Sequence, residues 1–321
     1  MARVFVTGGT GFVGSYVAKD LCDHGHDVVV YDLSTDTRIL DALGVAADVT
    51  LREGDVTESD AVTQAIADTE ATHVVHLAAL LTNAAREDPR AAYQVNIGGT
   101  NNVFEAARRL DDQVERVCWA SSAAVYAPPA NYDDGDAWWV TEDDLVYPDT
   151  LYGATKEYNE HQARVYAEEY DLSLVGLRPT VAYGPYRETG GSAFLANIVE
   201  KPALGESFSV EYGDQEIDWQ HVADIAQAFR LGAFTPSADL SREVYNVRGE
   251  LATIREAVET MRSIMPDADL TVSDEGELPW TQRLDMTAAQ RDLGYEPVYD
   301  LETGFRDYVN TLRADGGLDP V

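Results

Sequence analysis

Residues 3–14 read Arg-Val-Phe-Val-Thr-Gly-Gly-Thr-Gly-Phe-Val-Gly, and this stretch decides the fold. Val4–Val6 is typical of a short buried strand, and the pattern Gly-x-x-Gly-x-x-Gly at residues 8–14 follows it. The pattern then predicts a helix to about His24, with Gly25 as its C-terminal stop. A glycine turn between a strand and a helix lets a pyrophosphate approach the N-terminus of the helix.

The next strand, predicted over 27–31, ends at an acidic residue. Asp32 lies 18 residues beyond Gly14, where a carboxylate can accept hydrogen bonds from an adenosine ribose. The stretch therefore predicts a dinucleotide-binding site. Because Asp32 would repel a 2′-phosphate, we expect NAD rather than NADP. Arg38 is the one residue nearby that favours NADP, and we interpret it as a surface residue.

Strands and helices alternate through the first half of the chain. Short apolar strands separated by helices indicate a parallel sheet covered on both faces, an α/β fold of the Rossmann type with a doubly wound sheet. Further strands are predicted near 49–51, 72–77, 114–120 and 173–177, and helices near 59–68, 93–109 and 153–170.

Two domains are predicted from this pattern. Residues 1–178 form an NAD-binding domain, to which the chain returns near 218–248, with a strand at 244–247. Residues 179–217 and 249–321 form a smaller C-terminal α/β domain for the substrate. The segment 128–139, rich in Pro, Asp and aromatic residues, is predicted to be a loop, either over the active site or on the acidic surface.

The charge of the chain limits its partners. It has 57 acidic residues against 23 Lys and Arg, a formal net charge of −34, which argues against nucleic acid or an anionic membrane. An ordinary acidic protein and a protein from a halophile, adapted to high salt, both fit, and we favour the second. No apolar run reaches membrane-spanning length, the N-terminus enters a strand at once, and no metal-ligand spacing occurs, so we expect a cytoplasmic protein without a metal.

Tyr152 and Lys156 form the pair that carries most of the predicted chemistry. Four residues apart, they share one face of a helix, and this lysine is one of three in the chain. Taken separately, they fit a packed aromatic residue and a solvated helix lysine. Taken together, they predict a base, because a nearby cation favours the phenolate and should lower the pKa of Tyr152.

Several motifs, in this order, resemble the extended short-chain dehydrogenase/reductase family, the group of NAD-dependent epimerases and dehydratases. The resemblance covers nearly the whole chain. The matching stretches are Thr7-Gly-Gly-Thr-Gly-Phe-Val-Gly14, Asp32, Gly54-Asp-Val56, His76-Leu-Ala-Ala79, Val95-Asn-Ile-Gly-Gly-Thr100, Ser121-Ser122, Val125-Tyr126, Tyr152-x-x-x-Lys156 and Arg178-Pro179.

The resemblance implies roles for individual residues. Tyr152 would remove a proton from a substrate hydroxyl, Lys156 would lower the tyrosine pKa and hold the nicotinamide ribose, and Ser122 would hydrogen-bond the reacting oxygen. The residues implied to contact NAD are Gly8, Gly11, Phe12, Val13, Gly14, Asp32, Asp55, Val56, Leu77, Ala78, Ala79, Asn96, Tyr152 and Lys156.

A homodimer is also implied by the resemblance. It would form through the helices near 93–109 and 153–170. Tyr158, Val165 and Tyr166 would lie either in that interface or in the core.

The chain departs from the family where nucleotide diphosphates are usually held. Ile217 stands where many members have Arg, Val181 where many have Asn, and the usual Arg-Pro-Gly-Asp run upstream of Asp285 is absent, although Arg283 is near. Ser122, Val181 and Arg283 are the candidate substrate contacts. Ala123-Ala124 replaces the Asp-Glu pair of the dehydratases, which argues against dehydration.

Three functions remain open at this point. The first, which the family resemblance favours, is an epimerase of a sugar or sugar-like substrate, free or carried on a nucleotide. The second is a net NAD-dependent dehydrogenase of a free sugar, a polyol or another small alcohol. The third, a non-catalytic NAD-binding regulator, is disfavoured because Ser122, Tyr152 and Lys156 are all present.

Overall fold

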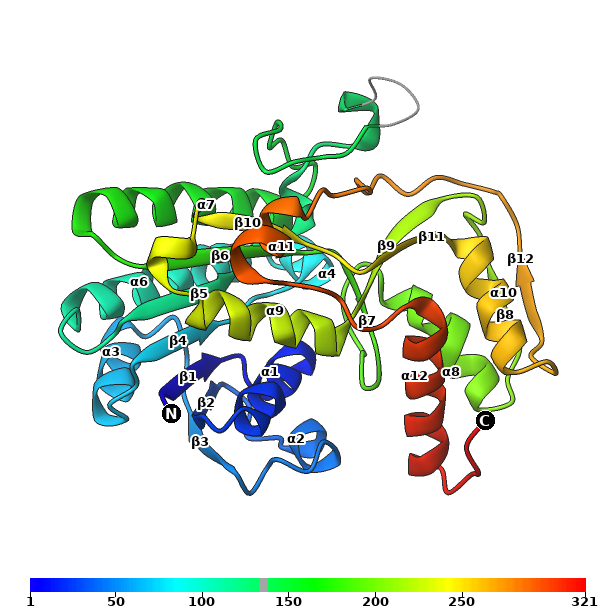
Figure 1. Cartoon of the computed structure of the whole chain (residues 1–321), viewed down its shortest axis with the longest axis horizontal. Coiled ribbons are helices and arrows are strands. Elements are labelled where there is room, and N and C mark those ends of the chain that lie inside the picture. Colours follow the sequence, from blue (N-terminus) through cyan, green and yellow to red (C-terminus); the bar gives the residue numbers. More distant parts are fainter. Residues whose placement is uncertain (133–137) are drawn as a thin grey trace.

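A seven-stranded sheet with only parallel strand pairs forms the centre of the larger part of the molecule (Figure 1). The structure is a computed structural model that describes residues 1–132 and 138–321. The strand order is β10-β6-β5-β4-β1-β2-β3. The strands are β1 (Arg3–Thr7), β2 (Asp27–Asp32), β3 (Val49–Glu53), β4 (His73–His76), β5 (Arg116–Ala120), β6 (Leu174–Pro179) and β10 (Val244–Val247).

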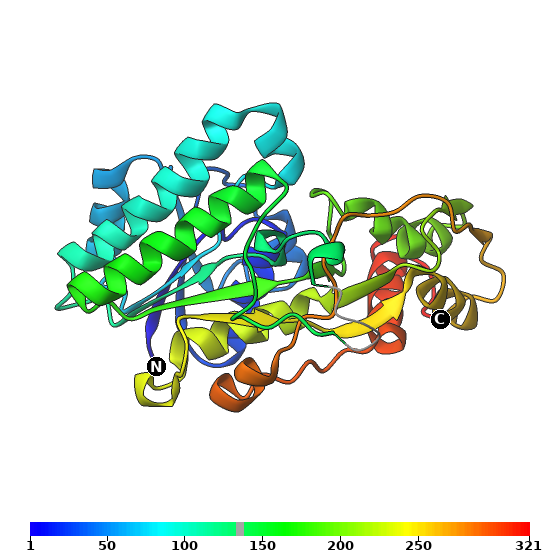
Figure 2. The ribbon, with the colours of Figure 1, turned by 90° about the horizontal axis from the view of Figure 1, so that it is seen from above.

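Helices cover both faces of this sheet, because its strands are apolar on both sides. In β1, Val4 and Val6 pack with α1 and α9, whereas Phe5 faces the opposite side, where α3 and α6 pack. In Figure 2, α6 and α7 run side by side over that second face. The predicted doubly wound α/β fold is therefore confirmed. The helices of this part are α1 (Phe12–Asp23), α2 (Arg38–Ala42), α3 (Ser59–Asp68), α4 (Thr82–Glu87), α5 (Pro89–Ala92), α6 (Thr100–Arg109), α7 (Leu151–Tyr170), α9 (Val222–Phe234) and α11 (Thr287–Leu293).

A smaller part with its own hydrophobic core lies beside the large sheet (Figure 1). Ile217, Trp219 and Phe305 are fully or almost fully buried in that core. β10 lies next to β6 in the large sheet, so the chain returns there before it ends in the smaller part. The elements are β7 (Val181–Tyr183), β9 (Glu216–His221) and β11 (Glu250–Thr253) in one sheet, β8 (Phe208–Val210) and β12 (Leu270–Val272) in another, and α8 (Asn197–Ala203), α10 (Ile254–Ile264) and α12 (Leu301–Asp315). The domain boundaries themselves stay a prediction.

The helix expected over 93–109 has two parts with different geometry. Tyr93–Gly99 is a π-helix, η1, and α6 continues from Thr100. Short 3₁₀ helices complete the elements of the described residues: η2 (Ala123–Val125), η3 (Pro129–Asn131), η4 (Ala193–Ala196) and η5 (Ser237–Asp239). Part of the loop expected at 128–139 falls outside the described residues. Within the described ranges, no helix is both long and apolar enough to span a bilayer.

The lysines are divided between the two parts. Lys19 lies on α1 and pairs with Asp23, and Lys201 lies on α8 and pairs with Glu206. Both side chains are more than a third exposed, whereas Lys156 on α7 is buried.

Candidate active site and cofactor groove

The glycine turn between β1 and α1 leaves no room for side chains at two positions. Gly8 has φ +69°, and a Cβ there would lie 2.8 Å from the backbone nitrogen of Ala78. A Cβ on Gly14 would lie 2.0 Å from the carbonyl oxygen of Gly8. Gly11 precedes α1, whose first turn carries no acidic side chain. The turn therefore fits a pyrophosphate at the positive end of the helix dipole.

Asp32 is held in place at the end of β2. Its carboxylate accepts hydrogen bonds from the backbone nitrogens of Thr10 at 3.1 Å and Ser34 at 3.0 Å, and its remaining lone pairs can accept more. It lines a cavity of about 320 Å³, together with Thr10, Gly11, Phe12, Ser34, Asp36, Arg38, Ile39, Tyr186, Glu188 and Thr189. This groove fits the adenosine end of a dinucleotide.

Arg38, the residue that favoured NADP, already has a partner in this groove. Its Nη1 lies 3.0 Å from the Oε1 of Glu188, a residue that follows β7 in the chain. A carboxylate in contact with the guanidinium competes with a 2′-phosphate for it. The arrangement therefore agrees with the expectation that Asp32, rather than Arg38, decides between NAD and NADP.

Other predicted cofactor residues line up along the ends of neighbouring strands. The Thr7 hydroxyl accepts hydrogen bonds from the nitrogens of Leu77 at 3.2 Å and Ala78 at 3.3 Å. This contact fixes the loop after β4, which Ala79 continues. The remaining positions are Val13 in α1, half-buried, Val56, buried, and Asp55, whose Oδ1 accepts from the nitrogen of Thr57 at 2.8 Å.

Asn96, on the π-helix, ties the loop after β4 to α7. Its Oδ1 accepts from the Leu80 nitrogen at 2.7 Å, and its Nδ2 donates to the Leu80 carbonyl at 3.0 Å and to Thr155 Oγ1 at 3.1 Å. Thr155 directly precedes Lys156. A π-turn is rare and often occurs at a functional site, and here it carries the residue that fixes the neighbour of the candidate lysine.

The three candidate catalytic residues come from two elements that meet. Ser122 follows β5, and its Oγ accepts from the Ala124 nitrogen at 3.1 Å. Tyr152 and Lys156 lie in the first two turns of α7. The Nζ of Lys156 donates to the carbonyl of Ala120, the last residue of β5, at 2.7 Å, and lies 5.6 Å from the centre of the Tyr152 ring. The serine, the phenol and the ammonium are thus brought together.

The expected fall of the Tyr152 pKa is not found in this arrangement. Burial raises the pKa of Tyr152 to about 12, because the phenolate loses its hydration, and the neighbouring Ser122 hydroxyl acts in the opposite direction. Burial also lowers the pKa of Lys156 to about 8, while the charge of Glu160 raises it. Loss of water thus decides the direction in which the pKa of Tyr152 moves.

A buried ion pair beside these residues was not predicted. Arg178, at the end of β6, donates from Nε and Nη2 to the two carboxylate oxygens of Glu160 on α7, at 2.8 and 2.7 Å. Ser121 also donates to Glu160, at 2.5 Å, and Arg178 also contacts the hydroxyl of Tyr126. Glu160 lies one helical turn beyond Lys156, and that spacing was the signal available in the sequence.

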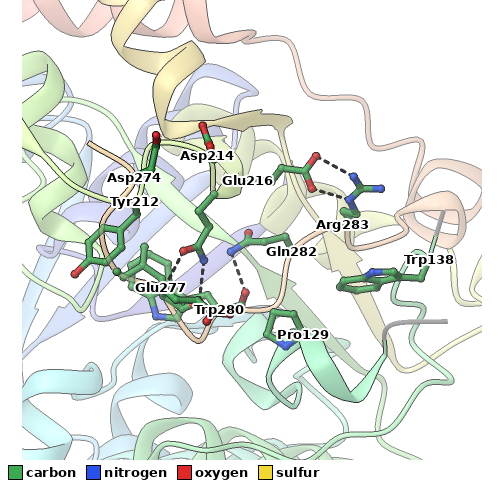
Figure 3. A pocket seen from close by; sticks show the side chains of 13 residues that line it. Pro129, Trp138, Tyr212, Asp214, Glu216, Asp274, Glu277, Trp280, Gln282 and Arg283 are labelled. Carbon is green, nitrogen blue, oxygen red and sulfur yellow. Dashed lines mark hydrogen bonds and ion pairs between the residues drawn. The ribbon is translucent and has the colours of Figure 1, made fainter. Parts of the chain in front are cut away.

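Of the candidate substrate contacts, Arg283 lies in a cavity, whereas Val181 packs against a hydrophobic core. Arg283 lines a second cavity, of about 330 Å³, and forms an ion pair there with Glu216, with Nε–Oε2 at 2.6 Å and Nη2–Oε1 at 2.9 Å (Figure 3). Val181, on β7, packs instead against the core of the smaller part, and Ile217 is fully buried in that core. The cavity is lined by Pro129, Trp138, Tyr212, Asp214, Gln215, Glu216, Asp274, Gly276, Glu277, Leu278, Trp280, Gln282 and Arg283.

Comparison with known proteins agrees with this geometry. Residues 4–247 match the model of the NAD-dependent epimerase/dehydratase family. UDP-glucuronate 4-epimerase 3 of Arabidopsis thaliana is 30% identical over 336 aligned positions, which cover 95% of this chain and 75% of the relative. The crystal structure of UDP-glucose 4-epimerase from Thermus thermophilus in complex with NAD is 28% identical, with a TM-score of 0.80 over 97% of this chain and 99% of that one. L-Threonine 3-dehydrogenase from Trypanosoma brucei, 20% identical over the whole of both chains with a TM-score of 0.87, shares the fold.

Proposed function

We propose, because the chain belongs to the NAD-dependent epimerase/dehydratase family, that it is an epimerase acting at a secondary alcohol of a sugar, either free or carried on a nucleotide. It is an enzyme of the extended short-chain dehydrogenase/reductase type, and its cofactor is NAD. The observation that carries the proposal is the meeting of Ser122, Tyr152 and Lys156 after β5, a strand of the same parallel sheet whose strands β1 and β2 end at the glycine turn and at Asp32. Family relatives named as sugar epimerases support the choice of reaction.

NAD, when bound, supplies the acceptor and donor of a hydride. Gly8, Gly11, Phe12, Val13 and Gly14 would hold it at the start of α1.

The remaining predicted contacts would continue along the strand ends. They are Asp32, Asp55, Val56, Leu77, Ala78, Ala79 and Asn96, followed by Tyr152 and Lys156 at the reacting end.

Tyr152 would act as the base for the substrate hydroxyl. The Ser122 hydroxyl would hydrogen-bond the same oxygen and hold it near the phenol. The Lys156 ammonium, fixed by the Ala120 carbonyl, would favour the phenolate as the proton leaves the substrate. In an epimerase, the ketone would turn its opposite face toward the cofactor. The hydride would then return to the carbon on that face, and the proton to the oxygen.

Net dehydrogenation is the second candidate, and one observation favours it. The cavity that includes Arg283 offers a diphosphate no free cation among its described lining residues, since Arg283 is paired with Glu216. A substrate without a nucleotide is compatible with a dehydrogenase of a sugar, a polyol or another small alcohol. The same observation is also compatible with an epimerase of a free sugar.

Retention of the cofactor distinguishes these reactions. Protein purified in molar KCl should carry bound NAD, convert a sugar to its epimer, and produce no net NADH when free sugars and UDP-sugars are supplied in turn. Steady release of NADH with added NAD would overturn the epimerase in favour of the dehydrogenase. Bound NAD with neither product nor NADH from any of these substrates would favour the regulator.

A homodimer is proposed through α7. Leu151, Tyr158 and Val165 are spaced seven residues apart on that helix and are 43%, 52% and 47% exposed. Tyr166, in contrast, donates to Glu105 on α6 at 2.6 Å and belongs to the packing within one chain. Light scattering should give the mass of a dimer for the wild type and of a monomer for the Tyr158→Glu/Val165→Glu double variant. Leu204→Glu, at an equally exposed site after α8, is the matched control.

Two further proposals rest on the amino-acid composition. The net charge of −34 supports adaptation to high salt, in a halophile, and a cytoplasmic location is proposed with it.

A further inference from the structure

We propose that Glu216 excludes nucleoside diphosphates by neutralising Arg283, and that the cavity they share accepts an uncharged, hydroxyl-bearing part of a sugar substrate. The inference rests on the proposed function and names the substrate class that this function would use. It begins from the charges that line the cavity of about 330 Å³ in Figure 3.

Carboxylates dominate this cavity. Asp214, Glu216, Asp274 and Glu277 line it, and Arg283 is the one basic residue among the described lining residues. Arg255 lies next to the cavity, but it already bridges Asp214 and Asp274. The group of four carboxylates and two arginines is therefore net negative, and a diphosphate entering it would meet repulsion.

One edge of the Arg283 guanidinium already holds a carboxylate. Both its Nε and its Nη2 are engaged in a two-point contact with the Glu216 carboxylate, at 2.6 and 2.9 Å. This fork geometry is the one that a guanidinium would otherwise offer to a phosphate. A diphosphate would have to displace Glu216 and leave that carboxylate beside its own negative charge.

The backbone around Arg283 is fixed on both sides, which keeps the pair in place. Asp218, fully buried on β9, accepts a hydrogen bond at Oδ2 from the Leu284 nitrogen at 3.2 Å, and its own nitrogen donates to Gln282 Oε1 at 3.1 Å. The carbonyl of Arg283 accepts from the nitrogen of Val140 at 2.9 Å. These contacts fix the backbone position of Arg283 next to β9, which carries Glu216.

Strand β9 contributes acidic groups and no cation to this region. Side chains alternate along a strand, so Glu216 and Asp218 point to one side and Ile217 to the other. Ile217 is fully buried in the core of the smaller part. The position at which many family members carry arginine thus adds only apolar packing here.

The rest of the lining suits a sugar. The rings of Tyr212, Trp138 and Trp280 offer apolar faces for the C–H side of a sugar ring. Gln215 forms a fixed wall, since its side-chain amide makes two hydrogen bonds with the backbone of Leu278, at 2.7 and 2.8 Å. Carboxylates accept hydrogen bonds from hydroxyl groups without needing a cation.

Binding of UDP, measured by calorimetry on the NAD-loaded protein, tests the proposal without requiring turnover. The salt should be the lowest at which circular dichroism shows the native fold, because salt screens the repulsion. The wild type should bind UDP weakly, and Glu216→Gln should bind it at least about tenfold more tightly through the freed Arg283. The Glu216→Gln/Arg283→Gln double variant should lose that gain.

Glu277→Gln is the matched control, because it removes one carboxylate from the same cavity without freeing Arg283. It should tighten UDP binding much less than Glu216→Gln. An equal effect of the two variants, or no gain in Glu216→Gln, would refute the role of the ion pair. Micromolar binding of UDP by the wild type would refute the proposal even if Glu216→Gln failed to fold.

Turnover separates this inference from the proposed function. Epimerisation of free sugars but not of UDP-sugars supports both. Epimerisation of UDP-sugars by the wild type overturns the substrate class and leaves the epimerase intact. Steady formation of NADH overturns the epimerase, while the UDP-binding results still decide the role of Glu216.

Discussion

Replacing Lys156 by methionine should make the protein more stable at pH 7 and remove its turnover. Methionine has nearly the volume of lysine and carries no charge. Lys156 is 3% exposed, and burial lowers its pKa from 10.5 to about 8. Keeping this ammonium charged at pH 7 therefore lowers the free energy of unfolding. Turnover should be lost because no cation remains to favour the Tyr152 phenolate.

The magnitude follows from the pKa of Lys156. A fall from 10.5 to about 8 corresponds to about 3 kcal/mol of free energy of unfolding. The variant also loses the hydrogen bond from the ammonium to the Ala120 carbonyl, which contributes about 1.5–3 kcal/mol because the donor is charged. We therefore expect Lys156→Met to be up to about 1.5 kcal/mol more stable at pH 7.

The advantage should disappear as pH rises. Between about pH 8 and 10.5, the unfolded wild-type chain holds the proton of Lys156 and the folded chain releases it, so the wild type gains stability with rising pH in this window. The methionine variant has no such proton. Below pH 8 both states of the wild type are protonated, and the difference between the two proteins should stay constant.

Urea unfolding of the nucleotide-free proteins at pH 7 and pH 9.5, in a fixed concentration of KCl, measures this difference. Lys19→Met is the control, since Lys19 is partly exposed on α1, and its stability relative to the wild type should not change between the two pH values. The reasoning fails if the stability difference between Lys156→Met and the wild type is the same at pH 7 and pH 9.5.

Three further outcomes are expected. Tyr152→Phe should lower turnover by at least about 100-fold while NAD binding, measured by calorimetry, stays near the wild-type value, because the phenol acts on the substrate; weak NAD binding would contradict its role as the base. Asp32→Ala should weaken NAD about tenfold or more and NADP much less, since it removes an acceptor for the ribose hydroxyls; equal weakening of both would show that Asp32 does not read the ribose. Raising KCl from 0.1 to 2 M should raise the unfolding temperature, because screening reduces repulsion within a chain of net charge −34; a temperature independent of salt would argue against salt adaptation.

The parts of the fold that short stretches of sequence encode were predictable. The glycine turn follows from Gly8 and Gly14, whose neighbours tolerate no Cβ, and the parallel sheet follows from apolar strands buried on both faces. The spacing of Tyr152 and Lys156 was sufficient to place them on one helical face.

Features that depend on distant contacts were not predictable. No local sequence pattern indicates the π-helix at Tyr93–Gly99. Its geometry accompanies the contacts of Asn96 with Leu80 and Thr155, which lie outside this stretch. The raised pKa of Tyr152 depends on burial by the folded chain, which a four-residue spacing does not report.

Ion pairs between residues that are distant in the sequence were also not predictable. Glu160 and Arg178 are 18 residues apart, and Glu216 and Arg283 are 67 residues apart. Their pairing depends on how the strands and loops meet, so the sequence identified Arg283 as a candidate but not the carboxylate that occupies it.

The small number of lysines also makes the protein suited to site-selective labelling. With Lys156 shielded by burial, Lys19 on α1 and Lys201 on α8 are the side-chain amines that an amine-reactive dye can reach, one in each part of the molecule. Donor and acceptor fluorophores at these two amines would report the distance between the two parts in solution. Lys19→Arg and Lys201→Arg variants would each leave a single side-chain label and provide the single-label controls, and no cysteine has to be introduced.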